Sequence, residues 1–186
     1  EEELKKIAVD LGFPLVIKPR FSAAGRGTVM VKDFAELLQR IRPAIESHGM
    51  PLLQEYIPGD LGEYLHVVMN RDGELKLAVH KRFQRYFRTQ PFPVYRESMP
   101  PQPYAKVCGK LLNRMRWWGG AVVEMRIDAR DGIPKLMEVN PRFGSGLLEL
   151  TELGINVPSM CLKIARSEEV ETVEKYPVAV VGEPLG

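Results

Sequence analysis

Two strand-like segments around a short turn constrain the fold of this chain more than any other part of its sequence. Residues 121–128 (AVVEMRID) and 134–140 (PKLMEVN) are rich in apolar and β-branched side chains. Asp131 and Gly132 lie between them, and residues of these types favour tight turns. The two segments therefore predict an antiparallel hairpin.

The register of this hairpin decides which charged side chains meet. With Asp131 at the centre of the turn, Arg126 lies opposite Leu136. In the same register Glu124 lies directly opposite Glu138, whereas a slip of one residue would turn Glu124 to the other face of the sheet. We expect the first register, in which two carboxylates face each other. That arrangement destabilises a sheet unless a positive charge compensates it.

Asn140 shares the strand face of Glu138, because side chains alternate between the two faces of a strand. Two carboxylates and an amide oxygen are ligands that suit Mg²⁺, which leaves other positions to substrate phosphates. A second interpretation stays open, in which Arg126 or Arg142 pairs with the acids on a solvated surface. The hairpin predicts either a magnesium site of Glu124, Glu138 and Asn140 or an exposed cluster of ion pairs.

A lysine and a glycine-bearing loop form a second candidate site near the start of the chain. Lys18 ends a short apolar strand, and the following loop contains Ser22, Gly25, Arg26 and Gly27. Small residues let a backbone approach an anion closely, and its N–H groups can then cradle a phosphate. The order of residues in a Walker loop is absent. The loop alone predicts either a phosphate contact or an ordinary turn between strands.

The periodicity of the remaining sequence predicts an α+β protein. Helical spacing favours helices at residues 2–11, from a cap at Asp33 to about 47, and at 104–118, 146–153 and 157–166. Further strands are expected at residues 14–18, 28–31, 51–56, 63–70 and 74–80. Residues 81–103 are rich in proline and without a period, which predicts a long ordered loop. Antiparallel hairpins favour this class over a doubly wound parallel sheet.

Composition excludes several classes of protein. The chain has 186 residues, of which 45% are hydrophobic and 27% charged, values typical of globular rather than disordered or fibrous proteins. The net charge of +2 gives only a mild bias towards anionic partners. Cys108 and Cys161 lie in apolar helical patterns without a C-x-x-C pair, which favours two reduced thiols over a disulfide. No signal peptide or membrane span is evident, so we expect a cytoplasmic protein.

Several segments occur in an order and spacing that resembles the ATP-grasp superfamily over about residues 10–166. These segments are residues 12–20 (GFPLVIKPR) with the loop that follows, 54–59 (QEYIPG), the pair Glu63 and Tyr64, and 138–142 (EVNPR). The last motif is the most specific, because this order of residues after the Asp131-Gly132 turn of a hairpin is hard to obtain by chance. The sequence is similar to the carbamoyl-phosphate synthetase type and to related carboxylate–amine ligases.

The resemblance implies an ATP-grasp fold, in which two α+β lobes with antiparallel sheets grip the nucleotide between them. Residues 1–57 would form the small lobe, with the lysine strand, the lid loop and the adenine linker. Residues 58–168 would form the large lobe with the metal-binding hairpin, and 169–186 a polar C-terminal tail. Because Glu1 is not a natural start, we expect a fragment that lacks an N-terminal substrate domain.

The resemblance also implies roles for particular residues. It assigns Lys18 to the ATP phosphates, Ser22, Gly25, Arg26 and Gly27 to a mobile lid, and Glu63 to the ribose hydroxyls. In the linker of Gln54, Glu55, Tyr56 and Ile57, the backbone of Glu55 and Ile57 would bind the adenine edge. It assigns Glu124, Glu138 and Asn140 to one or two Mg²⁺ ions, for which Mn²⁺ is a possible substitute, and Arg142 to the transferring phosphoryl group.

The implied reaction is an attack by a substrate carboxylate on the γ-phosphate of ATP. The acyl phosphate formed would then be captured by an amine or a thiol, with the protein mainly positioning groups and neutralising charge. We expect the fragment alone to bind ATP without turnover, and a homodimer is compatible with the sequence. The alternative is a non-catalytic nucleotide-binding module with a role in assembly or regulation.

A basic and aromatic stretch at residues 81–88 allows three interpretations. In the first, its aromatic residues anchor a solvated loop in the core; in the second, Lys81 or Arg82 contacts ATP or an acyl phosphate. A platform for single-stranded nucleic acid is the third interpretation and the least favoured. We take Lys81 as a candidate nucleotide contact and expect no nucleic-acid partner.

Overall fold

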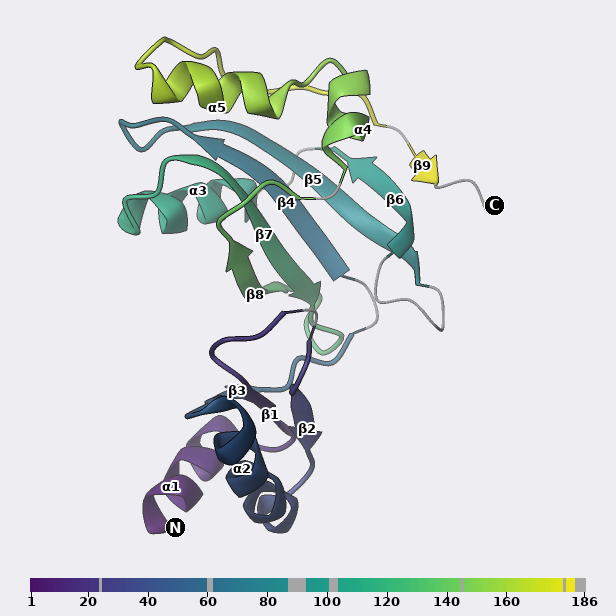
Figure 1. Cartoon of the computed structure of the whole chain (residues 1–186). Helices are drawn as coiled ribbons and strands as arrows, with labels where there is room; N and C mark the ends of the chain where they lie inside the picture. Colours follow the sequence, from purple (N-terminus) through teal and green to yellow (C-terminus); the bar gives the residue numbers. More distant parts are fainter. Residues whose placement is uncertain are drawn as a thin grey trace. The chain divides into compact units, whose positions relative to one another are not determined.

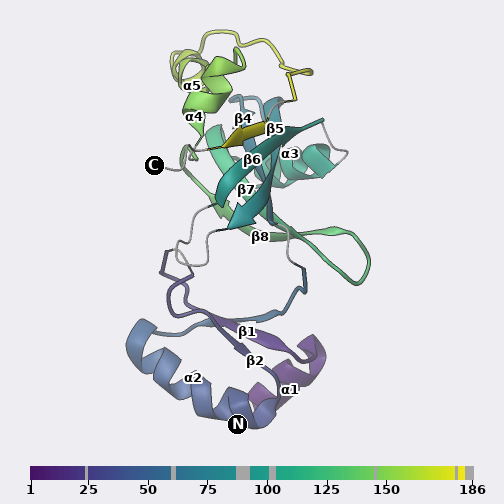
Figure 2. The same ribbon diagram turned by 90° about the vertical axis from the view of Figure 1, so that its right-hand side faces the viewer.

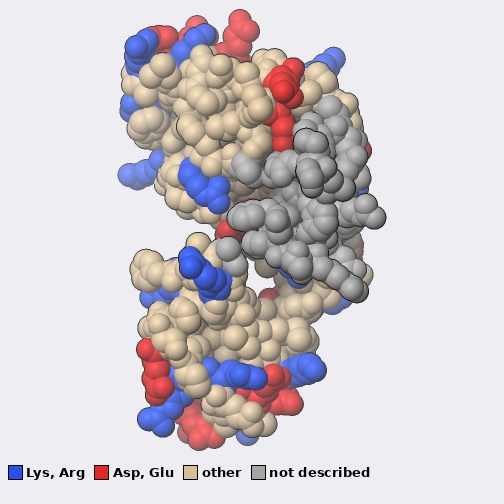
Figure 3. All heavy atoms as spheres, turned by 45° about the vertical axis from the view of Figure 1, so that its right-hand side comes forward, with Lys and Arg blue, Asp and Glu red and all other residues tan. Residues whose placement is uncertain are grey.

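The computed structural model divides the chain into two compact units, Glu1–Ile57 and Pro58–Gly186. The residues that it describes are 1–23, 25–59, 62–86, 93–100, 104–144, 146–178 and 180–182. Within these ranges, no helix combines the length and the apolar character needed to cross a membrane. Basic and acidic side chains are interspersed on the face drawn in Figure 3, in keeping with the small net charge.

The first unit is a three-stranded antiparallel sheet with two helices (Figure 1). Its elements are α1 (Glu2–Leu11), β1 (Leu15–Lys18), β2 (Val29–Val31), α2 (Phe34–His48) and β3 (Leu52–Glu55), and the strands lie in the order β2-β1-β3. The Asp33 side chain accepts a hydrogen bond from the Glu36 backbone N–H at 2.8 Å, as the predicted helix cap requires.

The helices of this unit cover one face of its sheet. Leu15 and Ile17 alternate with Val16 and Lys18 along β1, and only the first pair is fully buried, in the core formed with α1 and α2. Val16 and Lys18 therefore belong to the other face, because successive side chains of a strand point in opposite directions.

The second unit is a six-stranded antiparallel sheet with helices on both faces (Figure 2). Its elements are β4 (Gly62–Met69), β5 (Leu75–Tyr86), β6 (Pro93–Met99), α3 (Tyr104–Arg114), β7 (Gly119–Ile127), β8 (Pro134–Asn140), α4 (Leu147–Glu152), α5 (Val157–Ala165) and β9 (Val180–Gly182). The strands lie in the order β8-β7-β4-β5-β6-β9. Together, the two units confirm the α+β class.

Both faces of the large sheet are apolar, and each packs on different helices. Leu65 and Val67 of β4 point to α3, where they share a core with Leu112. Val68 of β4 points to the other face, in a second core with Leu150 of α4 and residues of α5. We call these the α3 face and the α4/α5 face. Odd-numbered residues of β4, including Met69, belong to the first face, and even-numbered residues belong to the second.

The central hairpin has the predicted pair of facing acids, but its turn differs from the prediction. Glu124 pairs with Glu138, whereas Arg126 pairs with Lys135 rather than with Leu136. The register shifts between Glu124 and Met125, so Met137 of β8 is an extra residue in a β-bulge. The predicted centre of the turn was therefore wrong by half a residue. The bulge restores the predicted pairing of the acids.

The stretch predicted as a loop at 81–103 is largely strand. β5 continues to Tyr86, and β6 pairs with it in antiparallel fashion. Pro93 is the first residue of β6. Proline is tolerated at the start of a strand, although it has no N–H to donate to the neighbouring strand. Residues 87–92 and 101–103 lie outside the described part of the chain.

Two further predictions need correction at the ends of elements. The helix expected to reach residue 118 ends at Arg114, and Arg116 has a left-handed backbone (φ 54°) that cannot continue it. The segment expected as a polar tail packs on the large sheet: Val170 is buried in the α4/α5 core. β9 then pairs with β6, so the segment adds a strand to the sheet edge.

Candidate functional site

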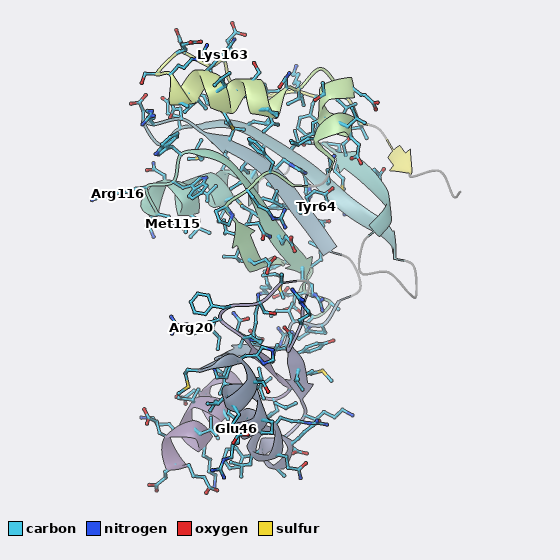
Figure 4. All side chains as sticks on the ribbon, in the orientation of Figure 1. Arg20, Glu46, Tyr64, Met115, Arg116 and Lys163 are labelled. Carbon is cyan, nitrogen blue, oxygen red and sulfur yellow. The ribbon has the colours of Figure 1, made fainter. Side chains whose placement is uncertain are left out.

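A row of polar side chains crosses the α4/α5 face of the large sheet. Lys81 of β5 pairs with Tyr64 of β4, Tyr64 pairs with Glu124 of β7, and Glu124 pairs with Glu138 of β8. Directly paired residues of an antiparallel sheet point to the same face, so the four side chains belong together. Figure 4 labels Tyr64 among the side chains of this sheet. The fold thus places the predicted metal ligands Glu124 and Glu138 and the candidate Lys81 on one face of the sheet.

Asn140 connects the two facing acids. Its side-chain Nδ2 donates to Glu124 Oε1 at 3.0 Å and to Glu138 Oε1 at 2.8 Å. The amide therefore offsets part of the repulsion between the carboxylates. A half-turn of this amide would present its oxygen in place of its nitrogen, which gives an all-oxygen donor set of the kind that Mg²⁺ takes.

The chemistry of this donor set fits a divalent cation that keeps non-protein ligands. Among the described residues, no three His, Cys, Asp or Glu side chains form a metal-binding cluster. A cation at the hairpin would therefore rely on two carboxylates, one amide and ligands such as water or phosphate. Mg²⁺ commonly binds proteins in this incomplete way, whereas Ca²⁺ and Zn²⁺ take larger or tighter protein shells.

Arg142 follows β8 on an exposed loop. Its backbone N–H donates to Asn140 O at 2.8 Å, and its Nη1 donates to Phe143 O at 3.1 Å. The first bond ties the backbone of Arg142 to the residue that bridges the acids. Arg142 is therefore placed close in the chain to the hairpin site, with its side chain exposed to solvent.

Lys81 is almost completely buried, at 1% exposure, rather than presented on a surface loop. Its Nζ donates to Glu149 Oε2 of α4 at 2.5 Å and lies 3.4 Å from Gly146 O. Glu149 is a site residue that the sequence did not reveal, because 68 positions separate it from Lys81. A buried lysine paired with an acid is also unsuited to a nucleic-acid platform, whose cations face solvent.

We expect Glu149→Ala to lower the free energy of unfolding by about 3 kcal/mol, because it removes the carboxylate from a buried ammonium group. Glu152→Ala, an exposed glutamate on the same helix, is the matched control and should change stability by less than about 0.5 kcal/mol. Urea unfolding at neutral pH measures both variants. Equal stability of the two would show that the Lys81–Glu149 pair adds nothing to the fold.

Glu63 lies on the opposite face of the sheet from the hairpin site, and its role as a ribose ligand stays a prediction. It pairs with Met125, a residue of the α3-face core, so it points away from Glu124. Its carboxylate is buried and accepts hydrogen bonds from Arg82 Nε at 3.0 Å and from the Tyr104 hydroxyl. His80 Nε2 lies 2.7 Å from Glu63 Oε2.

These contacts keep Glu63 ionised. Burial raises the pKa of the Glu63 carboxyl, but hydrogen bonds from His80, Tyr104 and Arg82 outweigh burial and lower this pKa to about 2. The same environment raises the pKa of the Tyr104 hydroxyl, first through burial and then through the hydrogen bond to Glu63. The cluster is a closed internal network on the α3 face.

In the first unit, Lys18 and Gln54 lie on the face of the sheet that α1 and α2 leave open. Val16 pairs with Gln54, and Val16 and Lys18 share that face. The Tyr56 N–H donates to Pro14 O at 3.2 Å, so the hydrogen-bonding groups of Tyr56 are directed to the strand side. The backbone groups of Glu55, the last residue of β3, point the opposite way, because their direction alternates along a strand.

The loop between β1 and β2 is an exposed, internally bonded turn. The Ser22 hydroxyl donates to Arg26 O at 2.7 Å, and the Thr28 N–H donates to Gly25 O at 3.1 Å. Gly25 and Gly27 have φ angles of 69° and 74°, which favour glycine. Ala24 lies outside the described residues. Arg20, which leads into the loop, is labelled in Figure 4.

The sequence of residues 1–173 matches the family model of the carbamoyl-phosphate synthase L chain, ATP-binding domain. This match covers nearly the whole chain. The chain belongs to this family. The resemblance to the ATP-grasp superfamily is thereby confirmed.

Two curated relatives of this ATP-binding domain extend well beyond it. A formate-dependent phosphoribosylglycinamide formyltransferase of Sulfurisphaera tokodaii is 29% identical over 170 residues, which cover 83% of this chain and 42% of that protein. A carbamoyl phosphate synthase large chain of Caldanaerobacter subterraneus is 27% identical over 176 residues, which cover 88% of this chain and 16% of that one. The chain thus spans less than half the length of each.

A solved structure supports the ATP-grasp fold of this domain. The biotin carboxylase domain of the 2-oxoglutarate carboxylase of Hydrogenobacter thermophilus superposes with a TM-score of 0.73 at 20% identity, over 91% of this chain and 40% of that one. That domain is a dimer in complex with ADP, the magnesium salt of ADP and bicarbonate. At this identity the likeness establishes the fold alone.

Proposed function

We propose that this chain is the ATP- and Mg²⁺-binding part of an ATP-dependent ligase that activates a carboxylate as an acyl phosphate for capture by an amine or a thiol. The observation that carries this proposal is the facing pair of Glu124 and Glu138, bridged by Asn140, in a member of the ATP-binding domain family. Two facing acids need a cation, and a nucleotide phosphate supplies the ligands that such a cation still lacks.

Glu124, Glu138 and Asn140 would hold the Mg²⁺ ion. When bound, this ion neutralises charge on the phosphates of ATP and helps to orient them. The exposed Arg142 would add a guanidinium to the transferring phosphoryl group, whose charge develops on its oxygens. No side chain needs to act as a nucleophile, because the substrate carboxylate would attack the γ-phosphorus and displace ADP, and the later amine or thiol would attack the acyl carbon and displace phosphate.

The first unit would contribute contacts to the nucleotide itself. Lys18 would meet the phosphates from the open face of its sheet, and the loop of Ser22, Gly25, Arg26 and Gly27 would close over them. Along the linker of Gln54, Glu55, Tyr56 and Ile57, the backbone groups of Glu55 and Ile57 would bind the edge of an adenine base. Glu63 is not part of this proposal.

We expect the chain to bind ATP, and to bind it at least about tenfold more tightly with Mg²⁺ than with chelator, which is about 1.4 kcal/mol of coupling. The reason is that the phosphates of ATP would supply ligands that a Mg²⁺ ion at the hairpin still lacks. Isothermal titration calorimetry with ATP, in Mg²⁺ buffer and in EDTA buffer, measures this difference.

An absence of binding heat at millimolar ATP would overturn the proposal. Binding of equal strength in the two buffers would remove the metal role of the hairpin. Metal-dependent binding by a parent protein that never releases ADP with any carboxylate and amine would instead support a nucleotide-binding module without catalysis.

A further inference from the structure

The loop that carries Arg142 turns back over the α4/α5 face of the large sheet. A second row of paired residues lies next to the polar row on this face: His66 of β4, Val122 of β7 and Asn140 of β8. After Asn140 the chain leaves β8, passes Arg142 and returns across this row at Gly144. His66 is buried, at 2% exposure, beneath the loop.

Gly144 rests directly on this second row. A Cβ atom at Gly144 would lie 2.6 Å from His66 Cε1 and 2.8 Å from Val122 Cγ2. Both distances are far below a van der Waals contact. Gly144 is not among the glycines with positive φ, so the requirement is for space rather than for an unusual backbone. Only glycine fits between this loop and the imidazole of His66.

The loop is fixed on either side of Gly144 as well. Gly120 of β7 leaves room for the ring of Phe143, since a Cβ there would lie 2.9 Å from Phe143 Cε1. Beyond Gly144, the Gly146 carbonyl lies 3.4 Å from the buried Nζ of Lys81. Close contacts at Phe143, Gly144 and Gly146 therefore fix the distance between this loop and the sheet.

We propose that Gly144 and His66 are positioning residues, which seat the loop so that Arg142 is held beside the site of Glu138 and Asn140. This inference rests on the proposed function, because it assumes that Arg142 serves the γ-phosphate of bound ATP. The ordinary alternative is that Gly144 and His66 only pack the core. The two explanations differ in whether a substitution of Gly144 weakens ATP binding only by displacing Arg142.

A cycle of variants separates these explanations. In Mg²⁺ buffer, Arg142→Ala should weaken binding of a non-hydrolysable ATP analogue about tenfold and leave ADP unchanged, because one charge-assisted contact to the γ-phosphate is lost. Gly144→Ala lifts the loop and should give the same selective loss. Addition of Gly144→Ala to Arg142→Ala should then cause no further loss, because both variants remove the same contact.

Gly132→Ala is the matched control. Gly132 lies in the turn of the hairpin, where no atom comes within 4 Å of an added Cβ, and its φ of 71° makes alanine strained. This variant should lose stability yet keep the preference for the ATP analogue over ADP. If Gly144→Ala does not fold, His66→Ala replaces it, since removal of the imidazole unseats the loop without a clash and should again add nothing to Arg142→Ala.

Additive losses in the Arg142→Ala background, or equal losses for ADP and the ATP analogue, would overturn the inference and leave Gly144 a packing residue. Failure of the wild-type chain to bind either nucleotide would instead reject the proposed function, and the inference with it. Titration of the wild-type chain distinguishes the two cases, because it shows whether nucleotide binds at all before any variant is compared.

Discussion

Glu138→Gln is expected to abolish the Mg²⁺ dependence of ATP binding while the fold stays as stable as the wild type or gains up to about 1 kcal/mol. The variant removes one of the two facing carboxylates, so the hairpin loses a metal ligand and its like-charge repulsion together. Asn140 can still donate to Glu124 and to the amide oxygen of the new side chain. Calorimetry with and without Mg²⁺ measures the first effect, and thermal unfolding in EDTA the second.

Glu152→Gln is the matched control, because it makes the same chemical change on an exposed helix position. It should leave both the Mg²⁺ dependence and the melting temperature unchanged. A large fall in the melting temperature of Glu138→Gln in metal-free buffer would contradict the prediction. That result would favour the other interpretation of the hairpin, in which Arg126 or Arg142 forms ion pairs with the acids.

Glu63→Ala is expected to lower the free energy of unfolding by about 3–5 kcal/mol, the largest effect on stability that we predict. The carboxylate is buried and binds Arg82, His80 and Tyr104, so its removal leaves these three groups without their common partner. Urea unfolding at pH 7 measures the loss. Glu74→Ala, at a largely exposed glutamate, is the control and should cost less than about 0.5 kcal/mol.

The pH dependence of this effect has a definite sign. The pKa of Glu63 is lowered from 4.5 to about 2 in the folded chain, so its ionised form stabilises the fold. This contribution is fully present above about pH 4.5 and is lost as the pH falls from there towards 2. The difference in stability between wild type and Glu63→Ala should therefore shrink over this range. A difference that stays constant would show that the lost packing, and not the charge, causes the effect.

The facing acids of the hairpin were predictable because two local rules agree there. A turn signal at Asp131 and Gly132 fixes where the chain reverses, and the period of two then brings Glu124 and Glu138 together. The bulge at Met137 was not predictable. It offsets the displaced centre of the turn, so Glu124 and Glu138 still face each other although every pair between them and the turn differs from the prediction.

The orientation of Glu63 was decided only by tertiary packing. In β4, odd-numbered and even-numbered positions both carry apolar residues, because both faces of the strand are buried. The sequence pattern therefore does not indicate to which face a polar residue such as Glu63 points. α3 covers one face and supplies Tyr104, which captures Glu63 on the side opposite Glu124.

The burial of Lys81 is also decided by tertiary packing, between residues 68 positions apart in the sequence. Its partner Glu149 lies on α4, and Gly146 lies directly before that helix, so both meet Lys81 through tertiary packing that no local spacing encodes. The sequence by itself determined the family, the α+β class and the pair of acids, because these depend on motifs and on strand periodicity. Only the tertiary structure decided which face each polar side chain occupies, because that depends on the helix that packs there.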